Sequence, residues 1–131
     1  MIYKVIIDTN VFISSRISIN GYPADIMNLI ADGQVELYYC PEILDEYTRV
    51  LAYKKFNFST ESCKLTIEDI KAVGNLVKPS VSEIPLPDES DRVFYDAAKF
   101  INGYLITGNQ KHYPKEPFIL TPMQFIELFN N

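Results

Sequence analysis

Short apolar runs alternate along this chain with longer stretches in which apolar residues recur at helical spacing. The runs that predict strands are rich in β-branched and aromatic residues and span residues 3–7, 35–39, 104–107 and 118–120. The helical stretches span residues 23–31, 41–52, 66–77 and 90–102, and a last one follows Thr121. Strands separated by helices pair in parallel through right-handed crossovers, and continuous apolar strands need cover on both faces. The pattern therefore predicts a three-layer α/β/α sandwich with a central parallel sheet.

Local signals set the expected boundaries of these elements. Thr66 and Asp69 have the spacing of a helix capping pair, so a helix is expected to begin at Thr66. Thr121 is expected to cap the last helix, with Pro122 in its first turn. Residues 78–87 hold three prolines and predict a loop or an edge segment. Residues 53–65 mix charged, aromatic and hydroxyl side chains and predict a segment that is helical in part.

The length and composition of the chain fit one domain over residues 1–131. It has 131 residues, 47% of them hydrophobic, with no repeat and no Ser/Gly-rich linker. No apolar run approaches the about 18 residues of a membrane-spanning helix, and the first residues lack the apolar stretch of a signal peptide. We therefore expect a cytoplasmic protein with no membrane partner.

Charge and thiol content narrow the possible function classes. A net charge of -5 argues against a protein that coats nucleic acid through bulk positive charge, but it leaves room for an enzyme that acts on nucleic acid through metal ions. Two scattered cysteines, Cys40 and Cys63, and a single histidine, His112, cannot supply a Cys/His zinc site.

Acidic and amide side chains follow the predicted strands, where the ligands of open parallel sheets bind. Asp8 ends the first strand, and Asn109 lies two residues after the third. Asp91 lies at the start of the 90–102 helix with Asp96 further along it, and Glu46 lies in the helix after the second strand. The helix acids could equally favour a helix dipole or face solvent. Asp8 favours a functional role more strongly, because an unpaired carboxylate at the end of a buried strand is costly.

Carboxylates brought together at one sheet edge repel each other unless a cation lies between them. Oxygen ligands without His or Cys suit Mg²⁺ or Mn²⁺. An ion held by carboxylates and water leaves positions for phosphate oxygens. The chemistry that follows from such a site is metal-assisted hydrolysis of a phosphodiester.

Four segments, in this order, resemble the motifs of PIN-domain nucleases. IIDTNVFISS at residues 6–15 resembles the opening of the family, in which Asp-Thr-Asn or Asp-Thr-Ser ends the first strand. PEILDEYTRVL at residues 41–51 resembles the second motif, and DESDRVFYDAAK at residues 88–99 resembles the third. LITGNQKHYP at residues 105–114 resembles the strand and loop that usually carry Thr-Gly-Asp. The resemblance runs over residues 2–129 and is strongest for small stand-alone bacterial and archaeal members assigned as toxins of toxin–antitoxin pairs.

The resemblance implies a role for each matching residue. Asp8, Glu46 and Asp91 would act as catalytic residues that bind the first metal, and Asp96 would be an outer or second-metal acid. Roles in positioning the substrate or water are implied for Thr9, Asn10, Thr107, Asn109 and Lys111.

Some of these residues have an equally good structural explanation. Thr9 and Asn10 could cap the following helix, and His112, on the same loop as Lys111, is better explained as a solvated loop residue. Asn109 departs from the family pattern, because it offers a neutral carbonyl oxygen where most members have an Asp.

Cations and aromatic residues follow the second motif. Arg49, Lys54 and Lys55 could bind an RNA backbone or form a solvated helix end. Phe56 and Phe58 could stack on single-stranded bases beside these lysines or belong to the core.

The resemblance implies a Mg²⁺- or Mn²⁺-dependent endoribonuclease, a hydrolase of single-stranded RNA that is the toxin of a toxin–antitoxin pair. Its implied partners are RNA and a cognate antitoxin protein, and a homodimer is left open. The alternative is a PIN-like module that binds RNA or protein without cutting, which Asn109 and the acidic net charge favour. A third class, the receiver or phosphatase domain, lacks its own pattern, since an Asp-x-Asp phosphatase needs an acid where Asn10 stands.

Overall fold

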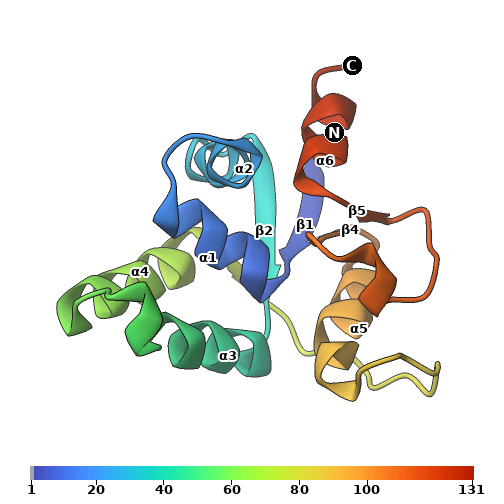
Figure 1. Ribbon diagram of the computed structural model, residues 1–131. Coiled ribbons are helices and arrows are strands. Elements are labelled where there is room, and N and C mark those ends of the chain that lie inside the picture. The colour runs from blue at the N-terminus through green and yellow to red at the C-terminus, as the bar shows by residue number, and fades with distance from the viewer. Residues whose placement is uncertain (1) are drawn as a thin grey trace.

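A parallel sheet forms the middle of the molecule in the computed structural model, which describes residues 2–131 (Figure 1). Within these residues the sheet has five strands in the order β3-β2-β1-β4-β5, and every neighbouring pair is parallel. The strands span, in chain order, Tyr3–Ile7, Val35–Tyr39, Asn75–Leu76, Tyr104–Ile106 and Ile119–Leu120. The predicted α/β class with a central parallel sheet is confirmed.

β1 lies in the middle of the sheet, and its apolar side chains are therefore buried on both faces. Val5 and Ile6 are completely buried, and Ile7 is 1% exposed. Tyr3 is paired with Val35 of β2 on one side, and Val5 with Tyr104 of β4 on the other. A run of β-branched residues without polar alternation is what such a position requires.

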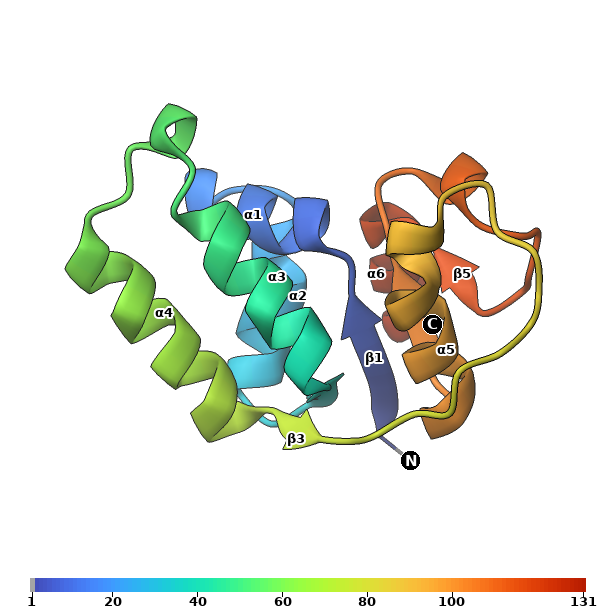
Figure 2. The ribbon, with the colours of Figure 1, turned by 90° about the horizontal axis from the view of Figure 1, so that it is seen from below.

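The helices form two layers, one on each face of the sheet (Figures 1 and 2). α2 (Tyr22–Ala31) and α6 (Pro122–Phe129) pack together on one face. α3 (Pro41–Leu51) and α5 (Arg92–Ile101) cover the other, and α5 lies against β1 and β4. α1 (Thr9–Ile17) contacts both α2 and α3, and α4 (Thr60–Val73) packs on α3. Short 3₁₀ turns complete the chain at Lys54–Phe56 (η1), Glu89–Asp91 (η2) and Gln110–His112 (η3).

The predicted start of the 66–77 helix at Thr66 is wrong. α4 begins at Thr60, because the side chain of Ser59 accepts a hydrogen bond from the backbone N–H of Ser62 at 3.0 Å. The hydroxyl of Thr66 instead donates to the carbonyl of Ser62, one turn back inside the helix, at 2.8 Å. The prediction that segment 53–65 is helical in part is confirmed.

The predicted end of this helix at residue 77 is also wrong. α4 ends at Val73, and Asn75–Leu76 forms the edge strand β3. Leu76 is paired with Tyr39, whose carbonyl also accepts from the backbone N–H of Val77 at 2.8 Å. The pairing with β2 thus replaces the last helical turn that the apolar spacing predicted. Within residues 2–131, no helix has the length and apolar character needed to span a membrane.

Candidate active site

Asp8 and Thr107 follow two neighbouring strands at the point where the sheet order reverses. The chain passes from β1 outward to β2 and β3, and then returns to the other side of β1 as β4 and β5. The backbone N–H of Asp8 donates to the carbonyl of Ile106 at 2.9 Å, which holds the ends of β1 and β4 together. This switch point, at the carboxyl edge of the sheet, is where open α/β sheets bind ligands.

The carboxylate of Asp8 is held by two hydroxyl groups from the C-terminal part of the chain. Its Oδ2 accepts from the Thr107 Oγ1 at 2.7 Å and from the Tyr113 hydroxyl at 3.3 Å. Burial raises the pKa of Asp8, and the hydrogen bond from Thr107 works against that rise. Burial and the nearby Asp8 charge raise the pKa of Tyr113, so its hydroxyl stays protonated and can donate.

Glu46 reaches the same edge from α3. The hydroxyl of Thr9, the first residue of α1, donates to its Oε2, and Arg49 lies 3.7 Å from its Oε1. The next residue, Tyr47, is buried and donates its hydroxyl to the carbonyl of Ile7 at the end of β1. Glu46 is therefore fixed relative to Asp8 through both the helix that carries it and the helix that follows β1.

Asp91 lies at the end of η2 and the start of α5. Its side chain is 15% exposed, and its Oδ2 lies 3.5 Å from the Nδ1 of His112. Across residues 2–131 this buried oxygen has no hydrogen-bond donor. Burial, followed by the charge of Asp8, raises the pKa of Asp91 to about 6, and Glu46 adds to the rise. The carboxylates of Asp8, Glu46 and Asp91 therefore act on one another electrostatically.

Asp96, unlike Asp8, Glu46 and Asp91, contacts the backbone of the segment before η2. It is 6% exposed, and its Oδ2 accepts from the backbone N–H of Ser82 at 3.0 Å. Arg92 donates to the carbonyl of the same Ser82 at 2.7 Å and to the carbonyl of Ile84 at 2.7 Å. Asp96 and Arg92 thus hold residues 78–88, the linking segment between β3 and η2, against the N-terminal half of α5.

The other predicted site residues differ in how firmly they are placed. Thr9 and Thr107 are buried, and each donates to an acid of the site. The backbone N–H of Asn109 donates to the Oγ1 of Thr107 at 3.1 Å, which ties the loop to the site while the residue itself is exposed. Asn10 and Lys111 are exposed at the same edge of the chain's fold, after β1 and β4 respectively.

Two residues beside the acids were not among the predicted site residues. Tyr113 donates to Asp8, and His112, whose side chain is 51% exposed as the sequence predicted, has its Nδ1 3.5 Å from Asp91. Their position in the loop after β4 was the available signal, because that loop starts at the switch point. Apolar periodicity gives no information on loops, so the direction of the side chains of Tyr113 and His112 was not predictable.

The donor set suits a hard divalent cation. Carboxylate oxygens with raised pKa values, one of them without a hydrogen-bond donor in the described part of the chain, are what a cation of the Mg²⁺ class would stabilise. Among residues 2–131, no three Asp, Glu, His or Cys side chains lie close enough together to form a complete ligand set. The ligand shell of such an ion would therefore include water or substrate oxygens, as is usual for Mg²⁺.

Comparison with known proteins identifies the family to which the chain belongs. The model of the family described as PIN domain matches residues 4–111. The chain is also 32% identical over 110 residues to an uncharacterized protein of Methanocaldococcus jannaschii. That match covers 82% of this chain and 71% of the archaeal protein. The matched region contains Asp8, Glu46, Asp91 and the start of the loop after β4.

Proposed function

Because the chain belongs to the PIN-domain family, whose members are nucleases that generally use divalent metal ions, we propose that it is a Mg²⁺- or Mn²⁺-dependent endoribonuclease acting on single-stranded RNA. The observation that supports this most is the buried oxygen of Asp91, which has no hydrogen-bond donor among residues 2–131 and whose pKa is raised by burial and then by the charge of Asp8. A cation bound beside this carboxylate would favour its ionised form.

In this proposal some residues of the chain hold the metal ion and others orient those ligands. Bound at Asp8 and Asp91, a divalent ion supplies Lewis acidity toward a phosphate oxygen and lowers the pKa of water. Thr107 and Tyr113 hold the carboxylate of Asp8 in one orientation, and Thr9 does the same for Glu46.

The remaining predicted residues take supporting parts in this proposal. Asn10, Asn109 and Lys111 are exposed at the edge of the site, where they can position water or the phosphate. Asp96 holds the linking segment with the oxygen that accepts from Ser82, and its other oxygen, buried and without a hydrogen-bond partner among residues 2–131, is available for an outer or second-metal role.

We also propose that the protein is a cytoplasmic toxin whose partner is a cognate antitoxin protein. The order and content of its four motifs, which resemble those of toxin-type PIN proteins, support this. The test is co-expression with a small neighbouring reading frame. Formation of a stable complex that suppresses RNA cleavage is expected, and unaltered cleavage in the presence of the neighbour's product would contradict the toxin role.

Cleavage of labelled single-stranded RNA with and without Mn²⁺ tests the enzymatic proposal. We expect metal-dependent cutting by the wild type and a loss of about 100-fold or more in Asp8→Asn and in Asp91→Asn, because each removes a charged ligand. Asp69→Asn is the matched control, since Asp69 is an exposed acid on α4 and the substitution should leave cleavage unchanged.

Two outcomes would contradict the proposal in different ways. Equal cleavage by the wild type and Asp8→Asn would assign the activity to a contaminant. RNA binding without cleavage would favour the second candidate, a PIN-like binding module. The specific observation behind that candidate is Asn109, which presents a neutral amide at the position where the family usually has an acid.

A further inference from the structure

A stretch of positive charge begins at the end of α3, next to the acids of the site. Between Glu46 and Glu61 the sequence contains no acid and three bases, Arg49, Lys54 and Lys55. The chain as a whole has 17 acids against 12 bases, and a second acid-free stretch with three lysines lies between Asp96 and Glu116, in the part of the chain that includes the loop after β4. The local charge is therefore opposite in sign to that of the whole molecule.

Arg49 connects this stretch to the site. Its Nη2 lies 3.7 Å from the Oε1 of Glu46, and its Nη1 donates to the hydroxyl of Tyr53 at 2.9 Å. Glu46 and Arg49 are one turn apart on α3, and Tyr53 continues the same side of the helix just past its end. The arginine side chain is 62% exposed, so it is available to a ligand that also contacts Glu46.

Aromatic rings continue the row beyond Tyr53. The rings of Tyr53 and Phe56 are nearly parallel, with an angle of 4° between them and centroids 6.4 Å apart. Phe56 and Phe58 follow with centroids 6.1 Å apart, and the ammonium group of Lys55 lies 5.2 Å from the centre of the Phe56 ring. Parallel rings interleaved with cations are the arrangement on which single-stranded bases stack while their phosphates contact Lys or Arg.

Core packing explains only part of this arrangement. Phe56 and Phe58 are partly buried against the core, so a structural role accounts for them. Tyr53 is 41% exposed, and Lys54 and Lys55 are exposed. Exposure alone does not mark a site, since Tyr22 is 44% exposed, so the row is distinguished by the parallel rings of Tyr53 and Phe56 beside these cations.

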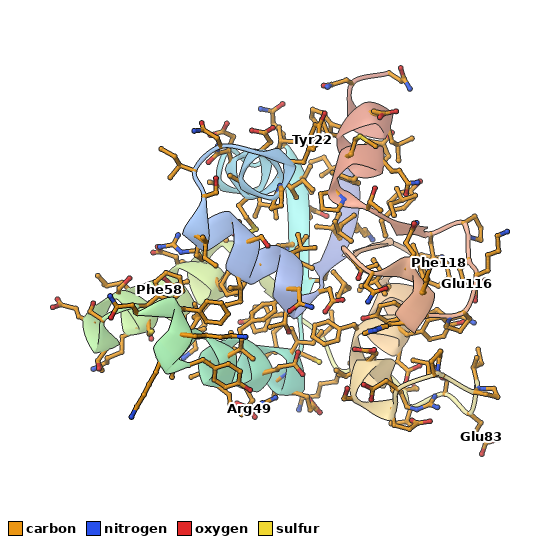
Figure 3. All side chains as sticks on the ribbon, in the orientation of Figure 1. Tyr22, Arg49, Phe58, Glu83, Glu116 and Phe118 are labelled. Atoms are coloured by element: carbon orange, nitrogen blue, oxygen red, sulfur yellow. The ribbon has the colours of Figure 1, made fainter. Side chains whose placement is uncertain are left out.

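We infer that Arg49, Tyr53, Lys54, Lys55 and Phe56, which we call the α3–η1 row, bind single-stranded RNA and lead it to Glu46. The inference rests on the proposed function and adds the path of the substrate to it. Tyr53 stacks on a base, the lysines contact phosphates, and Arg49 bridges the row and the acids. Figure 3 shows Arg49 and Phe58 on the α3 side of the molecule and Tyr22 on the opposite side, above α2.

Binding of a short fluorescein-labelled oligouridylate, measured by anisotropy in the presence of a chelator, tests the row without any cleavage. We expect Tyr53→Ala to raise Kd by about fivefold or more, as for the loss of one stacked base. Tyr53→Phe keeps the ring and should bind nearly as well as the wild type. Tyr22→Ala is the matched control, because Tyr22 is 44% exposed on another face and its loss should leave Kd unchanged.

The salt dependence separates stacking from charge. Loss of one phosphate contact in Lys55→Ala should make the slope of log K against log salt shallower by about 0.7, the value for a single strand. Tyr53→Ala should lower the affinity and leave that slope unchanged. Lys55→Ala should melt like the wild type because Lys55 is exposed, whereas Tyr53→Ala also loses the hydrogen bond with Arg49 and the contact with Phe56, so its melting temperature is measured beside that of Tyr53→Phe.

The results distinguish this inference from the proposed function. Wild-type binding that is absent in chelator, or that is insensitive to both Tyr53→Ala and Lys55→Ala, overturns the α3–η1 row even if the enzyme cuts RNA. Binding that depends on Tyr53 in a protein that does not cleave with Mn²⁺ keeps the row and overturns the nuclease.

Discussion

At the scale of single residues, the carboxylate of Asp91 is strongly perturbed by its surroundings. Its pKa is raised from 3.8 to about 6, first by burial and then by the charge of Asp8. The folded state therefore binds the proton more tightly than the unfolded chain does. Ionisation of Asp91 consequently costs stability as the pH rises from about 4 to about 6, and that stability stays lost at higher pH.

We expect Asp91→Asn to stabilise the metal-free protein at neutral pH. The neutral amide avoids the cost of the buried charge, and the gain should be about 1–2 kcal/mol at pH 7 and near zero at pH 4. Thermal melting in chelator at the two pH values measures it. A variant that melts below the wild type at pH 7 would show that the charge of Asp91 is already compensated in the folded protein.

Asp88→Asn is the comparison variant, because the pKa of Asp88 is lowered where that of Asp91 is raised. Hydrogen bonds from the backbone and side chain of Ser90 lower the pKa of Asp88, so its charge favours the folded state. The charge of Asp88 also raises the pKa of Asp91, so these two effects oppose each other, and Asp88→Asn should stabilise the protein at pH 7 less than Asp91→Asn does.

The sequence predicted individual residues unevenly. Asp8 was predictable because an acid that ends a buried apolar strand must lie at the carboxyl edge of the sheet. Tyr113 and the contact of His112 with Asp91 were not predictable, since they depend on how the loop after β4 folds back over the site. Asp96 was expected as an outer or second-metal acid, and its hydrogen bond with Ser82 was not predictable, because it depends on the path of the linking segment, on which the sequence gives only prolines.

At the scale of elements, Arg92 fixes how the linking segment approaches Asp91. Its guanidinium donates to two carbonyls of that segment and to both carboxylate oxygens of Glu89. A planar fork with five N–H donors can make these contacts together, whereas the single ammonium of a lysine cannot. Asp91 lies between Glu89 and Arg92, so this network also sets the position of the acid.

We expect Arg92→Lys to loosen the linking segment. Amide hydrogens of residues 79–88 should exchange about fivefold faster or more, because roughly 1 kcal/mol of local stability is lost with each missing hydrogen bond. Hydrogen exchange followed by mass spectrometry measures it. Arg16→Lys, on the exposed end of α1, is the control and should change nothing in the segment; equal exchange in the two variants would rule out the role of Arg92.

Elements were predicted well where apolar spacing was uninterrupted and poorly where two signals competed. The strands β1 and β2 and the helix α3 match the predicted spans closely. α4 was misplaced because Ser59 and Thr66 both head plausible capping patterns, and tertiary packing on α3 favours the longer helix. The two residues of β3 carry no periodicity, so only their pairing with β2 identifies them as a strand.

At the scale of the whole molecule, occupation of the acidic site should stabilise the fold. A divalent ion that binds the native state alone adds about 2.7 kcal/mol when its concentration is 100 times Kd. We expect Mn²⁺ to raise the melting temperature of the wild type by several degrees and that of Asp8→Asn much less. Titration with the metal at constant ionic strength measures the effect, and Asp69→Asn should follow the wild type. Equal shifts in wild type and Asp8→Asn would place the bound metal elsewhere.

The hydrogen bond between Thr107 and Asp8 joins residues that are 99 positions apart in the chain. During synthesis at about 5–20 residues per second, the ribosome needs roughly 5–20 s to travel from one to the other. Throughout that interval β1 has no β4 beside it, and Asp8 lacks both hydroxyl groups that orient it. If the chain cuts RNA as proposed, its site is incomplete while its own message is being translated, until β4 and the loop after it have been made.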